Sequence, residues 1–345
     1  MINVGIIGYG YWGTNLVRNF FAAKNCCVKS VADFRPERLQ QLERSFPSVK
    51  GVKHALEIIQ DPEINAVVIA TPVFTHFELA REAILAGKNV LLEKPMTSSV
   101  EEAEILIDLA EQKGVLLMVD HTYLYTGAVE KMKQLIDRSE LGCIKYLDST
   151  RINLGLFQSD INVLWDLAPH DLSILKYLVS EQPYSVNARG ITHTENRIEN
   201  IAYLTVNFQS GLIAHFNCSW SSPVKLRMML IGGDKKMILF NDLEPTEKIK
   251  VYDTGYSYAT DEEKKQVLVD YRTGDIHVPK VATSEALLNM AEDFISCIEQ
   301  KNTPKSSSYL GLEVVRILEA STQSIRNHGK EVILEPSYAA ALMHS

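Results

Sequence analysis

The chain has 345 residues, of which 46% are hydrophobic and 23% charged, and its net charge is −8. This length predicts two domains of ordinary size. The negative charge, without any Lys/Arg-rich block, argues against a nucleic-acid partner or an anionic membrane surface. No apolar run approaches the roughly 20 residues of a membrane span, and strand pattern begins too early for a signal segment, so we expect a cytoplasmic protein.

The cysteines and histidines argue against two further classes of protein. The five cysteines form no C-x-x-C pair, and the nine histidines show no metal-ligand spacing. We therefore expect neither a disulfide framework nor a metal site.

The first part of the chain alternates strand and helix signals. Strands are predicted over residues 4–7, 28–32, 66–70, 90–92 and 115–119, and helices over residues 14–24, 36–46, 75–86 and 99–113. Ser99 and Glu102 have the spacing of a capping box at the start of the last helix. Short apolar strands separated by helices predict a parallel, doubly wound sheet, hence an α/β domain over residues 1–121.

The loop after the first predicted strand reads GYGYWG and has the spacing G-x-G-x-x-G. Gly8 permits a tight turn, Gly10 lets the backbone approach a pyrophosphate, and Gly13 allows close helix packing. We expect this loop, with Tyr11 and Trp12, to bind a dinucleotide. The alternative is a glycine turn without a ligand.

Asp33 ends the second predicted strand, 20 residues after the last loop glycine. A carboxylate at this point accepts hydrogen bonds from the adenosine ribose hydroxyls. Because it also repels a 2′-phosphate, it favours NAD over NADP as the cofactor. The nearby Arg35 moderates that preference.

Lys94 follows the strand predicted over residues 90–92, at the carboxyl edge where open α/β sheets bind ligands. A lysine there can hydrogen-bond a substrate oxygen and stabilise negative charge that develops on it. Pro95 restricts Lys94 to extended backbone conformations. The alternative is an exposed lysine that ends a strand and has no catalytic part.

The pattern changes after about residue 122, where apolar and polar residues begin to alternate. It predicts strands over residues 202–208, 212–220 and 236–240, and helices over residues 284–300 and 311–327. We therefore expect a second domain of α+β type over residues 122–345, built on an antiparallel meander. Its last helix is expected to dock back on the first domain.

The segment VLWDLAPHDLSILKYL contains a second set of residues suited to chemistry. Pro169 suits the first turn of a helix, and Asp166 and His170 can then share one face. Near a helix N-terminus the imidazolium is disfavoured, which leaves His170 a usable base near neutral pH, oriented by Asp166. The alternative is a helix cap and a polar residue without a catalytic role.

In combination, GYGYWG, IATPVFTHFELA, LLEKPM and D-x-x-x-H resemble the glucose–fructose oxidoreductase/inositol dehydrogenase (Gfo/Idh/MocA) family over essentially the whole chain. The resemblance implies an N-terminal Rossmann domain and a C-terminal domain with a large, mostly antiparallel open sheet. It implies NAD(P)-dependent chemistry on sugars, nucleotide sugars or inositols. It also implies catalytic roles for Lys94, Asp166 and His170, and a cofactor site lined by Thr71, Pro72, His76 and Glu93. One departure is Ala168, since the family often has glycine two residues before the histidine.

Substrate contacts are less sharply marked in the sequence. The amide-rich segment NLGLFQSDINVLW and the segment WSSPVKLR, which has a tryptophan and two cations, are suited to a sugar ring or a diphosphate. Polar loops without a ligand are the alternative. The candidate substrate residues are His121, Tyr123, Asn153, Gln158, Trp165 and Lys225, and the first two are also the next candidates for acid–base chemistry after His170.

We therefore expect an NAD-dependent oxidoreductase that interconverts a secondary alcohol and a ketone on a sugar ring, with a nucleotide-activated sugar as substrate. A free polyol or inositol dehydrogenase is the alternative within this class. A non-catalytic NAD-binding regulator is the alternative outside it, disfavoured because Lys94, Asp166 and His170 are all present. One face of the predicted second sheet is not covered by helices and mixes polar with apolar side chains, which favours a homodimer or homotetramer formed through that face.

Overall fold

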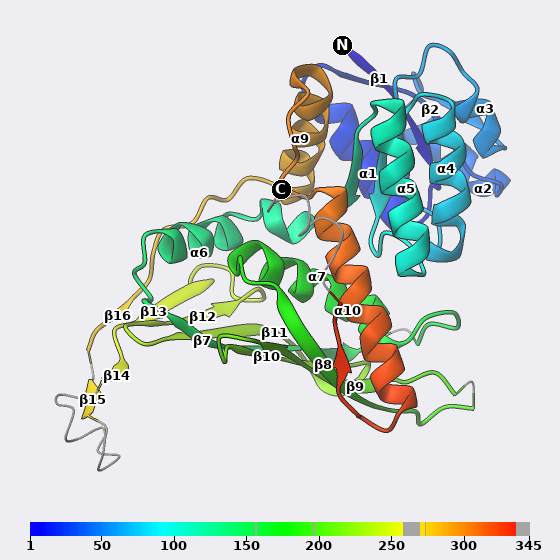
Figure 1. Cartoon of the computed structure of the whole chain (residues 1–345). Helices are drawn as coiled ribbons and strands as arrows, with labels where there is room; N and C mark the ends of the chain where they lie inside the picture. The colour runs from blue at the N-terminus through cyan, green and yellow to red at the C-terminus, as the bar shows by residue number, and fades with distance from the viewer. Residues whose placement is uncertain (156, 196, 258–269, 273, 336–345) are drawn as a thin grey trace. The chain divides into compact units, whose positions relative to one another are not determined.

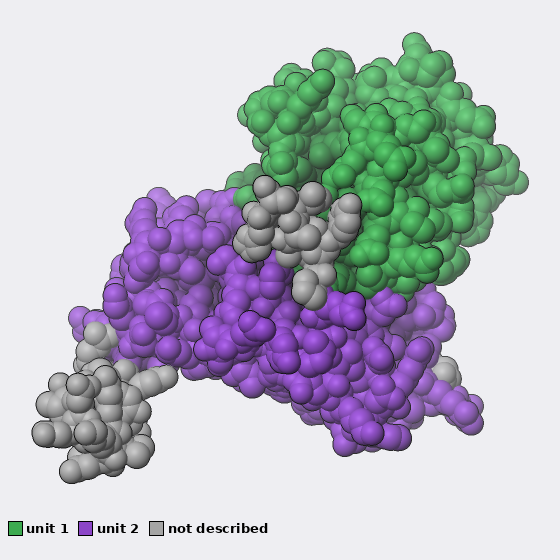
Figure 2. All heavy atoms as spheres, in the orientation of Figure 1, with its two compact units in different colours: residues 1–125, 284–316 green, residues 126–283, 317–345 purple. Residues whose placement is uncertain are grey.

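The computed structural model describes residues 1–155, 157–195, 197–257, 270–272 and 274–335 (Figure 1). It divides into unit 1, formed by Met1–Tyr125 and Ser284–Arg316, and unit 2, formed by Thr126–Thr283 and Ile317–Ser345 (Figure 2). Within the described ranges, no helix is long and apolar enough to cross a membrane. The same residues contain no group of three or more His, Cys, Asp or Glu side chains that could hold a metal ion.

Unit 1 is built on a six-stranded, fully parallel sheet in the order β3-β2-β1-β4-β5-β6. Its strands are β1 (Ile2–Ile7), β2 (Cys26–Ala32), β3 (Lys50–Val52), β4 (Ala66–Ile69), β5 (Asn89–Glu93) and β6 (Leu117–Asp120). The parallel sheet is confirmed, and the short β3 is an addition. Successive strands are added on one side of β1 as far as β3 and on its other side from β4 onward, so the strand order reverses between β1 and β4, which is the point where such sheets bind dinucleotides.

The four helices predicted between the strands of unit 1 are confirmed and begin at Tyr11, Pro36, His76 and Val100, whereas three short helices are additions and one helix predicted for the second domain belongs here. They are α1 (Tyr11–Ala22), α2 (Pro36–Ser45), α3 (Ala55–Ile59), η1 (Val73–Thr75), α4 (His76–Leu85), α5 (Val100–Lys113), η2 (Thr122–Tyr125) and α9 (Ala286–Gln300). Ser99 caps α5 by accepting the Glu102 N–H at 3.2 Å, as predicted. The Glu102 carboxylate accepts from Ser98 N and Oγ, so this return contact lies one residue earlier than in a capping box.

Unit 2 is built on a nine-stranded sheet in the order β16-β13-β12-β11-β7-β10-β9-β8-β17. Its strands are β7 (Ile144–Leu154), β8 (Pro183–Ile191), β9 (Ile201–Phe208), β10 (Ile213–Ser219), β11 (Ser221–Gly233), β12 (Met237–Asn241), β13 (Ile249–Tyr252), β16 (Ile276–His277) and β17 (Val332–Ile333), and β14 (Gly255–Ser257) pairs separately with β15 (Asp270–Arg272). The mostly antiparallel sheet is confirmed. The β7–β10 pair is parallel, which makes the sheet mixed and not a simple meander.

Among the residues that the structure describes, the helices of unit 2 are α6 (Gly127–Asp137), α7 (Val163–Leu178) and the second part of α10 (Ser308–Arg326), whose first part belongs to unit 1. The predicted start of α7 near Pro169 is wrong. Asn162 caps the helix by accepting the N–H groups of Leu164 and Trp165, which places Pro169 in the helix interior. His170 is therefore the eighth residue of this helix, beyond the first turn where the N-terminal dipole acts.

Candidate active site

The glycine loop of unit 1 fits a dinucleotide. Gly8 has a φ of 98°, and a Cβ there would lie 2.5 Å from the Ala70 carbonyl oxygen, so only glycine is tolerated. A Cβ on Gly13 would lie 2.0 Å from the Gly8 carbonyl oxygen. Around Gly10, the N-cap of α1, the nearest atom to an added Cβ is Arg35 Nη2 at 3.7 Å. The helix N-terminus therefore offers open space and backbone N–H groups to a diphosphate.

Two aromatic residues open α1 beside this loop. Tyr11 is 81% exposed and Trp12 is 41% exposed, and their rings meet edge to face with centroids 5.7 Å apart. The structure therefore places both predicted aromatic rings at the surface next to Gly10. They are positioned to flank whatever binds at the helix N-terminus.

Asp33 follows β2 and is already surrounded by donors. Its Oδ2 accepts the Tyr9 N–H and Arg35 Nη2–H, both at 2.8 Å, and its Oδ1 accepts Arg35 N–H at 3.0 Å and Nε–H at 2.9 Å. Burial opposes ionisation, but these hydrogen bonds outweigh it and lower the pKa of Asp33. A carboxylate has about four acceptor positions, so a ribose must share Asp33 with the Arg35 side chain or displace it.

His76 connects the loops that follow β4 and β5. Its Nδ1 lies 3.0 Å from the Pro95 carbonyl oxygen, and its Nε2 lies 2.8 Å from the Thr71 carbonyl oxygen. The ring is 1% exposed. Because both ring nitrogens face backbone carbonyls, we infer that His76 positions Thr71, Pro72 and the turn after Lys94, and that it does so without presenting its own ring to a ligand.

Glu93 and Asp120 form a buried carboxyl pair at the ends of β5 and β6, where they are direct cross-strand partners. Glu93 Oε2 accepts the Lys94 N–H at 2.8 Å, and Asp120 Oδ1 accepts from the Thr122 hydroxyl. Burial, and then the charge of Asp120, raises the pKa of Glu93 well above its usual value. Burial raises the pKa of Asp120 to about 6. Near neutral pH the pair therefore retains one proton beside Lys94.

His121 follows β6 and is buried. Among the residues that the structure describes, neither of its ring nitrogens has a hydrogen-bond partner. Burial and, to a smaller extent, the charge of Lys94 lower the pKa of His121 to about 3. Since so weak a base accepts protons poorly at neutral pH, the structure weighs against His121 as a substitute for His170. Tyr123 lies close by in η2.

In unit 2, Asp166 and His170 lie one turn apart on α7. Asp166 Oδ2 accepts a hydrogen bond from Trp220 Nε1 at 3.0 Å. Trp220 is buried, and the Phe157 ring packs on it with centroids 5.7 Å apart. Trp220 therefore holds Asp166 in place and presents no open ring face to a sugar, and its role could not be read from the segment WSSPVKLR.

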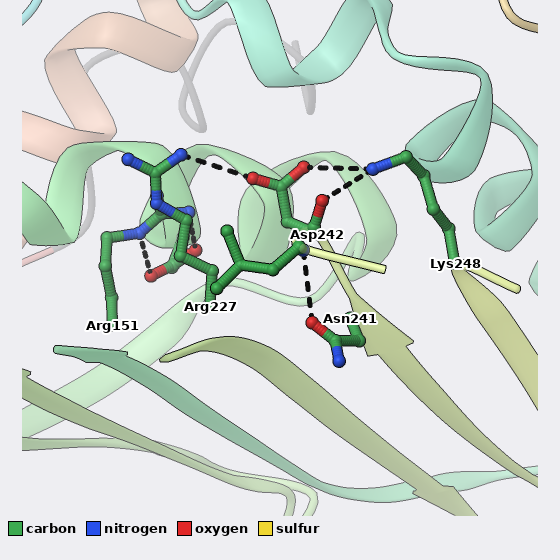
Figure 3. Close-up of polar contacts among 7 residues, drawn as sticks. Arg151, Arg227, Asn241, Asp242 and Lys248 are labelled. Atoms are coloured by element: carbon green, nitrogen blue, oxygen red, sulfur yellow. Dashed lines mark hydrogen bonds and ion pairs between the residues drawn. The ribbon is translucent and has the colours of Figure 1, made fainter. Parts of the chain in front are cut away.

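A buried ion pair, which the sequence did not reveal, fastens α7 to the sheet. Arg151 of β7 donates Nε–H and Nη2–H to the two oxygens of Asp171 at 2.8 and 2.7 Å (Figure 3). This bidentate geometry fixes both the distance and the rotation of the helix relative to β7. Because Asp171 follows His170 directly, the pair also fixes where His170 lies.

A second cationic group lies on the neighbouring strand. Arg227 of β11 is the direct cross-strand partner of Arg151. Its Nη1 lies 3.3 Å from Asp242 Oδ2, and Lys248 Nζ lies 3.7 Å from Asp242 Oδ1 and 2.5 Å from the Asp242 carbonyl oxygen (Figure 3). Asp242 is thus shared between two cations.

The other substrate candidates are distributed over unit 2. Asn153 is near the end of β7, Gln158 is in the following loop, and Lys225 is exposed on β11. Trp165 donates its Nε1–H to Thr322 Oγ1 at 2.9 Å, so its polar atom is engaged inside the unit. The structure gives no contact that joins these four residues into one group among the parts of the chain it describes.

Comparison with known proteins agrees with this geometry. The profile of the oxidoreductase family with an NAD-binding Rossmann fold matches residues 2–121, and that of the GFO/IDH/MocA C-terminal domain matches residues 129–239. The chain belongs to the Gfo/Idh/MocA oxidoreductase family. Its relatives in that family include sugar and polyol dehydrogenases, and this Gfo/Idh/MocA protein is accordingly an oxidoreductase consistent with that class.

Three relatives bear on substrate and cofactor. UDP-N-acetylglucosamine 3-dehydrogenase of Acidithiobacillus ferrooxidans is 30% identical over 63% of this chain and 67% of its own length. Two Bacillus subtilis scyllo-inositol 2-dehydrogenases are also similar to this chain. The NADP(+) enzyme is 28% identical over 67% of this chain and 63% of its own length. The NAD(+) enzyme is 25% identical over 95% of this chain and 93% of its own length. The solved structure of an oxidoreductase from Magnetospirillum magnetotacticum, 27% identical, superposes with a TM-score of 0.80 over 92% of this chain and 99% of its own.

Proposed function

We propose that this protein is an NAD(P)-dependent dehydrogenase or ketoreductase that interconverts a secondary alcohol and a ketone on the ring of a nucleotide-activated sugar. The observation that carries the proposal is the carboxyl edge of the unit 1 sheet. There the glycine loop, the ionised Asp33 and Lys94 follow β1, β2 and β5 respectively. The relationship to UDP-N-acetylglucosamine 3-dehydrogenase supports the nucleotide sugar as substrate.

The proposed roles follow from the chemistry of each side chain. A bound nicotinamide supplies the hydride acceptor or donor. In the oxidative direction, His170 takes the proton of the reacting hydroxyl and Lys94 stabilises negative charge on its oxygen. Asp166 orients His170 and is itself held by Trp220.

We propose NAD as the preferred cofactor. Asp33 is ionised and lies at the end of β2, where its charge opposes a 2′-phosphate. Arg35 offsets part of that charge through a bidentate contact. The preference is therefore moderate, in keeping with relatives that use either dinucleotide.

A free polyol dehydrogenase is the second candidate. It is favoured by the NAD(+)-dependent scyllo-inositol 2-dehydrogenase, which aligns over 95% of this chain. A non-catalytic regulator would need the dinucleotide site but neither Lys94 nor the Asp166–His170 pair.

The deciding experiment is a substrate panel with purified full-length protein. UDP-N-acetylglucosamine, other UDP-sugars, scyllo-inositol and myo-inositol are each incubated with NAD+ or NADP+, and nicotinamide absorbance is followed. We expect turnover with a UDP-sugar. Turnover with inositols alone would support the polyol dehydrogenase, and dinucleotide binding without any turnover would support the regulator.

A further inference from the structure

Arg227 and Arg151 lie directly opposite each other on neighbouring strands. Like charges in this arrangement destabilise a sheet unless each is compensated. Both belong to the helix-covered face, because Arg151 contacts Asp171 of α7 and the buried Met229 and Ile231 alternate with Arg227 along β11. The sheet therefore concentrates positive charge on the side that α7 covers.

The two arginines differ in burial and in the distance to the carboxylate that each contacts. Arg151 and Asp171 are buried and joined by two short hydrogen bonds. The contact from Arg227 to Asp242 is longer, at 3.3 Å, and the Arg227 side chain is 35% exposed. Lys248, 32% exposed, lies against the same carboxylate. Two accessible cations thus converge on one aspartate, which is the charge arrangement of a site that can accept a further anion.

Arg227, Lys248 and Asp242 are linked to the proposed acid–base residue through a series of neighbouring residues within unit 2. Arg227 is next to Arg151, Arg151 binds Asp171, and Asp171 follows His170. Arg227 lies one strand, about 5 Å, from Arg151, which anchors the helix that carries His170, so a substrate longer than a single sugar ring is suited to span from His170 to Arg227.

We propose that Arg227 and Lys248 bind a phosphate group of the substrate's nucleoside diphosphate, and that Asp242 is the internal counter-ion that this phosphate displaces. The inference rests on the proposed function and assigns its substrate to the phosphorylated class. A guanidinium matches phosphate oxygens in a bidentate fork, and lysine adds a point charge, whereas an uncharged polyol gains nothing from two cations. Lys248 thereby takes the place that the sequence pattern suggested for Lys225.

The test is calorimetric titration of the full-length protein with UDP, and with uridine as the ligand that lacks phosphate. Arg227→Gln and Lys248→Gln should each weaken UDP binding about tenfold or more and leave uridine unchanged. Asp242→Asn should tighten UDP binding at least threefold, because it removes the competing carboxylate. Arg189→Gln is the matched control, since Arg189 is exposed on the opposite face of the same sheet, paired with Tyr203.

The proposal is supported if Arg227→Gln weakens UDP binding and Asp242→Asn tightens it. In a merely structural ion pair, both substitutions would change UDP affinity in the same direction. UDP affinity within twofold of wild type in Arg227→Gln and Lys248→Gln, or equal losses in Asp242→Asn, would overturn it. Wild-type protein that binds NAD+ and oxidises a polyol but ignores UDP would overturn this inference alone. Failure to bind any dinucleotide would instead count against the proposed oxidoreductase. NAD+ titrations of the same variants should be unchanged, which separates this phosphate from that of the dinucleotide.

Discussion

A single guanidinium governs how Asp33 can be used. Sequence pattern places Asp33 correctly at the end of β2, because strand, turn and helix signals are local. The double contact from Arg35 could not be predicted from the sequence, because it depends on how the Arg35 side chain folds back over Asp33. The Glu93–Asp120 pair was equally hidden, because it requires β5 and β6 to be adjacent and in register.

Removing the Arg35 guanidinium should sharpen cofactor choice. We expect the wild type to bind NAD(H) at least tenfold more tightly than NADP(H), about 1.4 kcal/mol. In Arg35→Ala the charge of Asp33 is no longer offset, so NADP(H) affinity should fall a further fivefold or more while NAD(H) affinity changes less than threefold. Calorimetry on both dinucleotides measures this, with Arg44→Ala, at the far end of α2, as control. Equal affinities in the wild type would identify Arg35 as a 2′-phosphate ligand instead.

The acid–base assignment predicts losses of kcat that differ in size among three substitutions. His170→Ala should lower kcat about 10²–10⁴-fold, the usual worth of a positioned proton acceptor. Lys94→Ala should cost a similar factor, and Asp166→Asn less, because the base would remain in place. The Asp166/His170 double variant should be little worse than His170→Ala, since residues acting as one unit are non-additive. Single-turnover nicotinamide absorbance is the measurement.

Dinucleotide affinity should stay unchanged in His170→Ala, because the glycine loop and Asp33 belong to unit 1, whereas α7, which carries His170, belongs to unit 2. Wild-type rates in this variant would reduce His170 to a structural helix residue. Tyr123 would then be the next candidate for acid–base chemistry, ahead of the weakly basic His121.

The buried carboxyl pair predicts a pH-dependent stability. The pKa of Asp120 is raised from 3.8 to about 6, so its protonated form stabilises the fold below pH 3.8, and this stabilisation is lost as the pH rises through about 6. Each pKa unit corresponds to about 1.4 kcal/mol, which gives a loss of roughly 3 kcal/mol. Asp120→Asn should therefore gain stability relative to wild type between pH 4 and pH 7.

Urea unfolding across this range is the measurement for Asp120→Asn. Asp108→Asn, at an exposed position on α5, controls for the loss of one carboxylate. A stability difference that stays constant with pH would show that Asp120 does not hold the proton in the folded state.

At the scale of elements, α7 shows where local signals compete. Asn162 and Pro169 are both helix-start residues, and the side-chain cap at Asn162 decides the outcome because the apolar pattern already runs from residue 163. β7 escaped prediction for a related reason. Its covered face carries Ser149 and Arg151, which break the alternation of apolar residues that would mark a strand.

The Arg151–Asp171 pair should dominate the attachment of α7. Asp171→Ala leaves a buried guanidinium unpaired and should reduce the free energy of unfolding by about 3–5 kcal/mol. Replacing both partners, Arg151→Met with Asp171→Leu, should recover most of that loss. The control is Asp137→Ala, which removes the exposed partner of Lys133 and should cost at most about 1 kcal/mol. A loss for Asp171→Ala no larger than this control would contradict the anchoring role.

At the scale of the whole molecule, α7 covers one face of the unit 2 sheet and does not cover the other. Register places Leu230, Asp148, His215 and Thr205 in one row across four strands of the second face. Tyr203, Ile213 and Leu230 are 40–49% exposed there, and the Tyr203 and His215 rings stack with centroids 6.2 Å apart. A face that mixes aromatic, aliphatic and polar side chains over several strands is suited to a second copy of the chain.

We therefore expect a homodimer or homotetramer formed through this face. Light scattering at micromolar concentration should give a multiple of the 38.8 kDa chain mass. Ile213→Glu combined with Leu230→Glu should shift that mass toward the monomer, because two carboxylates would have to be buried in the contact. Ile105→Glu, an equally exposed position on α5, should leave the mass unchanged. A monomeric wild type would contradict the prediction directly. An oligomer that survives the double substitution would mean that the chain associates through another surface.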